Sequence, residues 1–305
     1  MIKPSFLALA AALAVTGAQA ENLVGLTTTN QLVQFDSSNP LQGSSIMSIS
    51  GLALNERLLG LDARPTTGLL YSISDAGKLY TLDAASGVAT FVANLTAGAP
   101  AAGGGAFTGL SGTSFGIDFN PVPDLAQVAP SLRVVSNAGQ NLRINVNGSN
   151  AGQTFVDTAL NGASSTIVAS AYTNNDTNPA TGTALYGIDT RADALFTTAA
   201  PNGGTMTKVG DLGTDAIGVS AFDVSASGVA YAALTDGDTA RSMLYSINLS
   251  TGAATSLGWF GVNGNALQAP LVGLTAAAAV PEPATVALML AGLGLIGLSA
   301  RRRAP

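Results

Sequence analysis

A unit of four short apolar-rich runs recurs along the chain and constrains its fold more than any other feature. Residues 58–95 read LLGLDARPTTG, LLYSISDAG, KLYTLDAASG and VATFVANL, and three of these four runs end in a turn that contains Gly. Short runs of this kind, joined by tight turns, are typical of a four-stranded antiparallel meander. Imperfect copies occupy residues 114–160, 168–212 and 219–260. The sequence therefore predicts an all-β repeat protein.

A fifth copy is divided between the two ends of the repeat region. Residues 22–52 contain only the last three runs, and the missing first run is LVGLT at 271–275, which matches LLGLD at 58–62. First runs thus begin at residues 58, 114, 168, 219 and 271. A circular shift of this kind closes a ring, because the last strand completes the first blade and covers an open sheet edge. We predict a five-bladed β-propeller of four-stranded antiparallel blades, closed by the C-terminal strand.

The Ala- and Gly-rich insert after the second unit leaves one alternative open. Residues 96–112 could belong to a degenerate sixth blade, which would make the ring six-bladed. The insert lacks two alternating apolar runs, however, and is rich in turn residues. We therefore expect a loop in this segment.

The composition excludes several classes of site. The chain has no His and no Cys, which excludes disulfides, zinc sites built on these residues, and imidazole or thiol catalysis. Its 12 basic and 18 acidic residues give a net charge of -6, the wrong sign for holding a phosphate backbone. Nucleic acid is therefore not expected as a partner, and any catalysis depends on carboxylates, Lys, Tyr or a bound metal.

Residues 1–20 have the pattern of a signal peptide. Lys3 precedes an apolar run at 6–15, and Ala18 and Ala20 form a small-x-small cleavage site. Ten apolar residues are too few to cross about 30 Å of hydrocarbon. We expect signal peptidase to cut after Ala20 and the body, residues 21–279, to be exported.

The C-terminal segment, residues 280–305, has three parts. Val-Pro-Glu-Pro at 280–283 precedes an apolar stretch at 284–300 and a basic cluster at 301–303. As a helix the apolar stretch would span about 25 Å, enough for a short transmembrane segment with its arginines on the cytoplasmic side. This tail resembles the PEP-CTERM sorting signal of Gram-negative bacteria. The resemblance implies an exosortase as partner, transient insertion in the inner membrane, and sorting through Pro281, Glu282, Pro283, Arg301, Arg302 and Arg303.

The body resembles a family of secreted bacterial proteins with a domain of unknown function. The segments LLGLDARPTTGLLY, LSGTSFGIDFNPVPD, RVVSNAGQNLRIN and AYTNN carry this resemblance, which covers most of residues 22–277. It implies no known activity. The chain departs from the family pattern at residues 124–131.

Three first strands place Asp at the same position: Asp62, Asp118 and Asp223. The other two units have Tyr172 and Thr275 there. First strands line the channel of a propeller, so the three carboxylates could meet at one mouth, as paired catalytic acids or a bound cation would require. Each Asp also precedes a turn, where its side chain could bond to nearby backbone amides. We favour this structural role.

Two polar loops contain spaced oxygen ligands of the kind that calcium prefers. Their candidate ligands are Asn174, Asp176, Asn178, Asp236 and Asp238. Neither loop has the closing bidentate Glu of a complete calcium loop, so ordinary Asx turns are the favoured interpretation. Calcium is the cofactor that these residues could hold, and the sequence requires none.

Together these features predict an exported protein of the cell envelope, outer surface or extracellular matrix that acts as a binding or structural module. Extracellular polysaccharide is the partner that this location favours. The alternative is a carboxylate-dependent glycan hydrolase or lyase with its site in the propeller channel.

Overall fold

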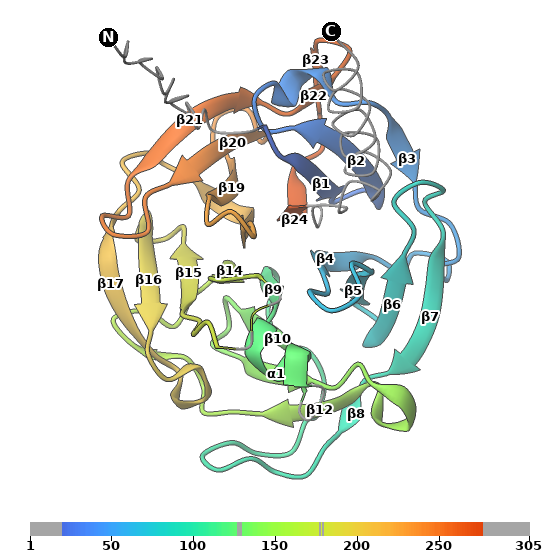
Figure 1. Ribbon diagram of the computed structural model, residues 1–305, viewed down its shortest axis with the longest axis vertical. Coiled ribbons are helices and arrows are strands. Elements are labelled where there is room, and N and C mark those ends of the chain that lie inside the picture. Colours follow the sequence, from blue (N-terminus) through green and yellow to red (C-terminus); the bar gives the residue numbers. More distant parts are fainter. Residues whose placement is uncertain (1–19, 127–129, 177, 179, 277–305) are drawn as a thin grey trace, which may run out of the picture.

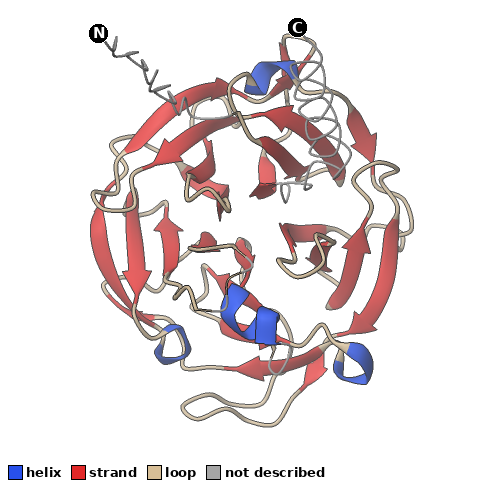
Figure 2. Cartoon of the chain, in the orientation of Figure 1, coloured by secondary structure: helices blue, strands red, loops and turns tan. Residues whose placement is uncertain are grey.

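The computed structural model describes residues 20–126, 130–176, 178 and 180–276, and these form a closed ring of five β-sheets around a central channel (Figure 1). Each sheet is one blade, with its first strand at the channel and its last strand at the rim. Strands dominate the described chain, with only a few short helical segments between them (Figure 2). The predicted five-bladed propeller is therefore confirmed.

The first two blades contain four strands each. Blade 1 has the order β24-β1-β2-β3, in which the strands are Leu271–Ala276, Asn22–Thr27, Gln31–Asp36 and Ile46–Ser48. Blade 2 has the order β4-β5-β6-β7, in which the strands are Leu58–Ala63, Leu70–Ser74, Lys78–Leu82 and Ala89–Asn94.

Blades 3 and 4 each gain a short fifth strand, and blade 5 has four. Blade 3 consists of β9 (Phe115–Phe119), β10 (Leu132–Ser136), β11 (Asn141–Ile144), β12 (Gln153–Val156) and β8 (Thr96–Ala97). Blade 4 consists of β14 (Ala169–Tyr172), β15 (Leu185–Asp189), β16 (Ala194–Thr198), β17 (Thr205–Asp211) and β13 (Asn161–Gly162). Blade 5 consists of β18 (Ile217–Val224), β19 (Ala230–Thr235), β20 (Ser242–Ile247) and β21 (Ala254–Trp259).

The ring closes through the C-terminal strand, as the shifted repeat predicts. β24 pairs antiparallel with β1, with Val24 opposite Thr275 and Gly25 opposite Leu274. The five first strands also contact one another in cyclic order, from β24 through β4, β9, β14 and β18 back to β24. β24 thus covers the edge of β1 that would otherwise be open, and the remaining edges at the channel are short and protected.

The insert at residues 96–112 forms no blade. Its first two residues form β8, which pairs parallel with β12 at the rim of blade 3. Residues 98–112 contain no strand. The six-bladed alternative is therefore wrong, because the segment lacks the alternating runs needed to build a sheet.

Local sequence explains the turns and the contacts between blades. Gly77 adopts a φ of 68° in the tight turn between β5 and β6, a conformation that glycine takes without strain. Apolar side chains fill the space between neighbouring sheets. Tyr71 of blade 2, for example, packs edge-on against Phe119 of blade 3 with ring centroids 5.4 Å apart.

One α-helix, α1 (Pro121–Ala126), follows β9 within the described chain. Its Asp124 is fully buried, forms an ion pair with Arg64 at 2.7 Å, and accepts hydrogen bonds from Thr66 and Ser131. The departure from the family pattern at 124–131 thus begins with a residue that links blades 2 and 3. Three short 3-10 turns complete the helical content of the residues that the structure describes: η1 (Pro40–Gln42), η2 (Gly148–Asn150) and η3 (Pro201–Gly203). A hairpin of β22 (Gly261–Val262) and β23 (Asn265–Ala266) precedes β24.

Both predicted targeting segments fall largely outside the described residues. Of the signal peptide only Ala20 is described, and the whole sorting segment, with its apolar stretch at 284–300, lies beyond residue 276. Among the residues that the structure does describe, no helix has the length and apolar character needed to cross a membrane.

Candidate functional site

The propeller channel is narrow because each first strand places a small residue in the same layer. These residues are Gly60, Gly116, Ala169, Ala221 and Gly273, and together with their neighbours they enclose a cavity of about 10 Å³. A Cβ atom added to Gly116 would lie 2.5 Å from the backbone nitrogen of Ser170, and one added to Gly273 would lie 2.6 Å from that of Leu61. The close approach of the five strands therefore depends on these small side chains.

The next layer along the channel is a ring of five residues that we call the channel ring: Asp62, Asp118, Ala171, Asp223 and Thr275. Strand register defines it, since Asp62 lies opposite Tyr71, Ala171 opposite Tyr186 and Asp223 opposite Tyr231. The sequence-based placement of Tyr172 at this position is thus wrong by one residue. Tyr172 is opposite Leu185, and because side chains alternate along a strand it points away from the ring.

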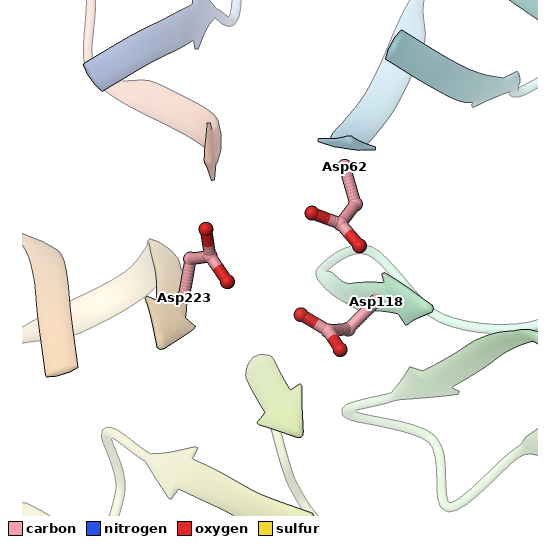
Figure 3. A group of neighbouring side chains, drawn as sticks. All are labelled: Asp62, Asp118 and Asp223. Atoms are coloured by element: carbon pink, nitrogen blue, oxygen red, sulfur yellow. The ribbon is translucent and has the colours of Figure 1, made fainter. Parts of the chain in front are cut away.

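The three carboxylates converge as predicted (Figure 3). One oxygen of each lies within 4.8 Å of the others, although the residues come from blades 2, 3 and 5. All three residues are buried, with exposed fractions of 1% for Asp62, 3% for Asp118 and 1% for Asp223.

Each channel-ring Asp accepts a hydrogen bond from the backbone of the next blade. Asp62 accepts from the N–H of Phe119 at 2.7 Å, and Asp118 accepts from that of Tyr172 at 3.0 Å. Asp223 accepts from Ala276 at 2.6 Å. The hydroxyl of Thr275 continues the pattern, because it accepts from the N–H of Ala63 at 3.2 Å.

These bonds link consecutive blades instead of capping each residue's own turn. The expected local role is met at Asp62, which also accepts from the N–H of Ala63 at 2.7 Å. Four of the five pairs of neighbouring blades are thus joined by such a hydrogen bond at the channel. The fifth pair lacks one because Ala171 has no acceptor atom in its side chain. Hydrogen bonds to charged groups contribute about 1.5–3 kcal/mol each.

Burial and mutual repulsion favour protons on this cluster. Burial, together with the charge of Asp223, raises the pKa of Asp62 well above its usual value. Burial and the charges of Asp62 and Asp223 do the same to Asp118. Burial raises the pKa of Asp223 to about 6. No ion pair of the described chain includes any of the three.

The five loop residues predicted as calcium candidates form local turns. The carboxylate of Asp176 accepts from the N–H of Asn178 at 2.7 Å, and Asp236 accepts from Thr239 at 2.8 Å. Asn174 donates to the carbonyl of Gly182 across the base of its own loop. Asp238 is exposed in the same turn as Asp236. In the described chain, the one group of three acidic residues close enough to share an ion is the channel cluster, and it includes none of these five.

A second polar site, which the sequence analysis missed, lies between blades 3 and 4. This arginine pocket has a volume of about 160 Å³ and is lined by Asn120, Ser131, Arg133, Arg143, Tyr172 and Asn202, together with two prolines. Arg133 is 2% exposed and occupies the strand position that Tyr71 and Tyr231 hold in other blades. An Arg at a strand position that holds Tyr in three of the other four blades was the signal that could have identified it.

Hydrogen bonds fix the two guanidinium groups of the pocket. Arg133 donates to Tyr172, Asn141, Asp157 and Asn202 over distances of 2.6–3.1 Å. Arg143 forms a bidentate pair with Asp157 at 2.7 and 2.8 Å. One carboxylate therefore balances two cations, which leaves a formal charge of +1 at the pocket of an acidic protein.

Arg143 also has hydrogen-bond donors that its pair with Asp157 does not use. Its Nε and one Nη bind Asp157, and no partner for the other Nη is found within the described residues. The side chain is 23% exposed, whereas that of Asp157 is 1% exposed. Solvent and ligands can thus reach the cation, while its counter-charge stays buried.

Comparison with known proteins identifies a family and distantly similar solved structures. No curated protein matches the chain in sequence. Similar solved structures include the nidogen/laminin complex, with 10% identity and a TM-score of 0.47 over 84% of this chain and 98% of that chain. Virginiamycin B lyase from Staphylococcus aureus has 10% identity and a TM-score of 0.40 over 78% and 70%. A protein of unknown function from Bacteroides thetaiotaomicron has 12% identity and a TM-score of 0.44 over 79% and 58%. Because all three TM-scores are below 0.5, these similarities support no inference about the fold or the activity of this chain.

Two family models match the sequence itself. The PEP-CTERM protein-sorting motif matches residues 279–303, which confirms the resemblance drawn from the C-terminal segment. The model of the domain of unknown function DUF4394 matches residues 31–270, the greater part of the chain. The protein therefore belongs to the DUF4394 family and carries a PEP-CTERM sorting motif.

Proposed function

We propose that this protein is an exported binding module of the cell surface or extracellular matrix, and that its arginine pocket holds an acidic group of an extracellular polysaccharide. The PEP-CTERM motif implies processing by an exosortase and export to the cell envelope or the extracellular space. A propeller suits a binding role, because it is a rigid ring whose loops surround the channel mouths.

The arginine pocket is the observation that carries the ligand assignment. Arg143 offers a partly exposed guanidinium beside a buried carboxylate, in a site with a formal charge of +1. The Nη of Arg143 that Asp157 leaves free can donate a charge-assisted hydrogen bond to a ligand carboxylate, and the amide of Asn202 and the hydroxyl of Tyr172 supply further polar contacts. At about 160 Å³ the pocket is below the roughly 300–1,000 Å³ of drug-sized ligand sites, which suits one acidic sugar unit.

The geometry of the channel gives the hydrolase or lyase alternative little support. A glycosidase needs two carboxyl groups roughly 5–9 Å apart on opposite sides of an accessible glycosidic bond. Here none of the three Asp residues is more than 3% exposed, although their nearest oxygens lie within 4.8 Å of one another. A sugar ring has no access to carboxylates packed in this way.

Calorimetric titration with two oligosaccharides of equal length tests the proposal. We expect an oligogalacturonate to bind and a neutral maltooligosaccharide to bind at least ten times more weakly. Arg143→Gln should reduce the affinity for the acidic ligand at least tenfold, because it removes the accessible charge. Arg191→Gln, at an exposed arginine outside the pocket, should leave the affinity unchanged. Equal affinity for the two oligosaccharides, or unchanged binding by Arg143→Gln, would refute the assignment.

A further inference from the structure

We propose that Asp62, Asp118 and Asp223 bind one calcium ion in the central channel. This site is independent of the arginine pocket, so either proposal can fail without the other.

The carboxylates have more acceptor capacity than the protein uses. Both oxygens of Asp62 accept hydrogen bonds, including one from the hydroxyl of Thr275 at 2.8 Å. In Asp223 the link to Ala276 uses Oδ2, while Oδ1 is buried without any hydrogen-bond partner. Figure 3 shows one oxygen of Asp223 directed across the channel toward Asp62 and Asp118. A buried, unpartnered carboxylate oxygen is costly and rare in folded proteins, so this one points to a missing partner.

The uncompensated negative charge of the three carboxylates also indicates a missing partner. Three acidic groups meet with no basic side chain bound to them. Of the four other buried acids of the described chain, Asp124, Asp157 and Glu56 pair with Arg or Lys, and Asp189 accepts hydrogen bonds from two hydroxyls instead. Three carboxylates in such a site require either protons or a cation near neutral pH. A cation would satisfy all three at once and leave the links between blades in place.

The donor atoms and their spacing select calcium. The ligands are all oxygens, which suit the hard cations Ca²⁺ and Mg²⁺. Three atoms that lie within 4.8 Å of one another can be no more than about 2.8 Å from a common centre. This limit is compatible with calcium–oxygen distances of about 2.3–2.6 Å, and calcium accepts irregular arrangements of ligands, whereas magnesium requires a near-ideal octahedron.

A bound ion would join blades 2, 3 and 5 across the channel. Its coordination shell would contain one oxygen of each of the three Asp residues, with the Thr275 hydroxyl beside Asp62 as a neighbouring polar group. Extracellular modules bind calcium with dissociation constants of about 0.1–1 mM, which matches an exported protein.

Calorimetry and thermal unfolding of the purified, EDTA-treated protein test the site at pH 7.5. We expect one calcium ion per chain and a weaker response to magnesium. At about 100 times the dissociation constant, calcium should shift the unfolding equilibrium about 100-fold toward the folded state and raise the Tm. Asp223→Asn and Asp118→Asn should each weaken calcium binding at least tenfold.

A matched control distinguishes calcium binding in the channel from calcium binding by the polar loops. The double variant Asp176→Asn, Asp236→Asn removes the loop carboxylates and should bind calcium like the wild type. Because a channel variant could fail to fold, a crystal of the wild type grown with calcium chloride gives an independent readout, with density for the ion expected between the three Asp residues. Absence of calcium binding by the wild type, loss of binding in the loop variant only, or density elsewhere would overturn the proposal.

Discussion

Replacing Asp62 by Ala tests the links between blades most severely, because this residue accepts more hydrogen bonds than any other member of the channel ring. The change removes acceptors for the N–H of Phe119 at 2.7 Å and the hydroxyl of Thr275 at 2.8 Å, both in buried surroundings. The N–H of Ala63 keeps the Thr275 oxygen as an acceptor. Two buried donors are therefore left without partners.

The magnitude follows from these two donors and one opposing effect. An unsatisfied buried donor costs about 1–3 kcal/mol, so the lost bonds together cost about 2–6 kcal/mol. The variant also removes one of three mutually repelling carboxylates, which offsets part of that cost when the other two are charged. We expect a net loss of about 2–4 kcal/mol in the free energy of unfolding at pH 5, and a smaller loss at pH 8 in calcium-free buffer.

Urea unfolding measures this difference, with Trp259, the only Trp of the chain, as the fluorescent probe. Asp83→Ala is the matched control. Asp83 is exposed and caps only its own turn through the N–H groups of Ala85 and Ser86, so its loss should cost about 1 kcal/mol or less. If Asp62→Ala cost no more than Asp83→Ala, the links between blades would not stabilise the propeller and the reasoning would be refuted.

Three further predictions concern pH, closure and sorting. Burial raises the pKa of Asp223 from its usual 3.8 to about 6, so between these values the folded state holds a proton that the unfolded state has lost. As the pH rises from 4 to 7, the free energy of unfolding of the calcium-free wild type, relative to that of Asp223→Asn, should therefore fall by on the order of 2–3 kcal/mol. A rise over this range would contradict the raised pKa. Deletion of residues 271–275 should abolish cooperative unfolding, since it removes the channel strand of blade 1, and an unchanged melting curve would argue against closure by β24. Replacement of Pro281-Glu282-Pro283 by three Ala residues should leave export intact and the C-terminal segment unprocessed, whereas normal processing by mass spectrometry would exclude the exosortase assignment.

The five-bladed ring could be predicted because its signals are local. Alternation within a strand and Gly in a turn depend on neighbours a few residues away, as in the hairpin turn at Gly77. The closing strand was recognisable because residues 271–275 repeat the pattern of residues 58–62. The insert at 96–112 was likewise identified as a loop from its lack of alternating runs.

The partners of the site residues could not be predicted in the same way. Asp62 and Phe119 are 57 positions apart, and Asp118 and Tyr172 are 54 apart, so nothing near either Asp reveals its acceptor role in the next blade. The register of β14 placed Ala171 in the channel ring only once its pairing with Tyr186 was known. The arginine pocket combines side chains from blades 3 and 4, which no single repeat contains.

A glycan array probed with the purified protein, in calcium and again in EDTA, tests the central claim of a binding module most directly. We predict signals on glycans that carry acidic sugars, their loss in Arg143→Gln, and intact glycans after incubation. Binding confined to neutral glycans would contradict the arginine pocket as the ligand site. Release of shortened sugars by the wild type, lost in Asp118→Asn with an unshifted Tm, would show that the protein is a glycan-active enzyme instead.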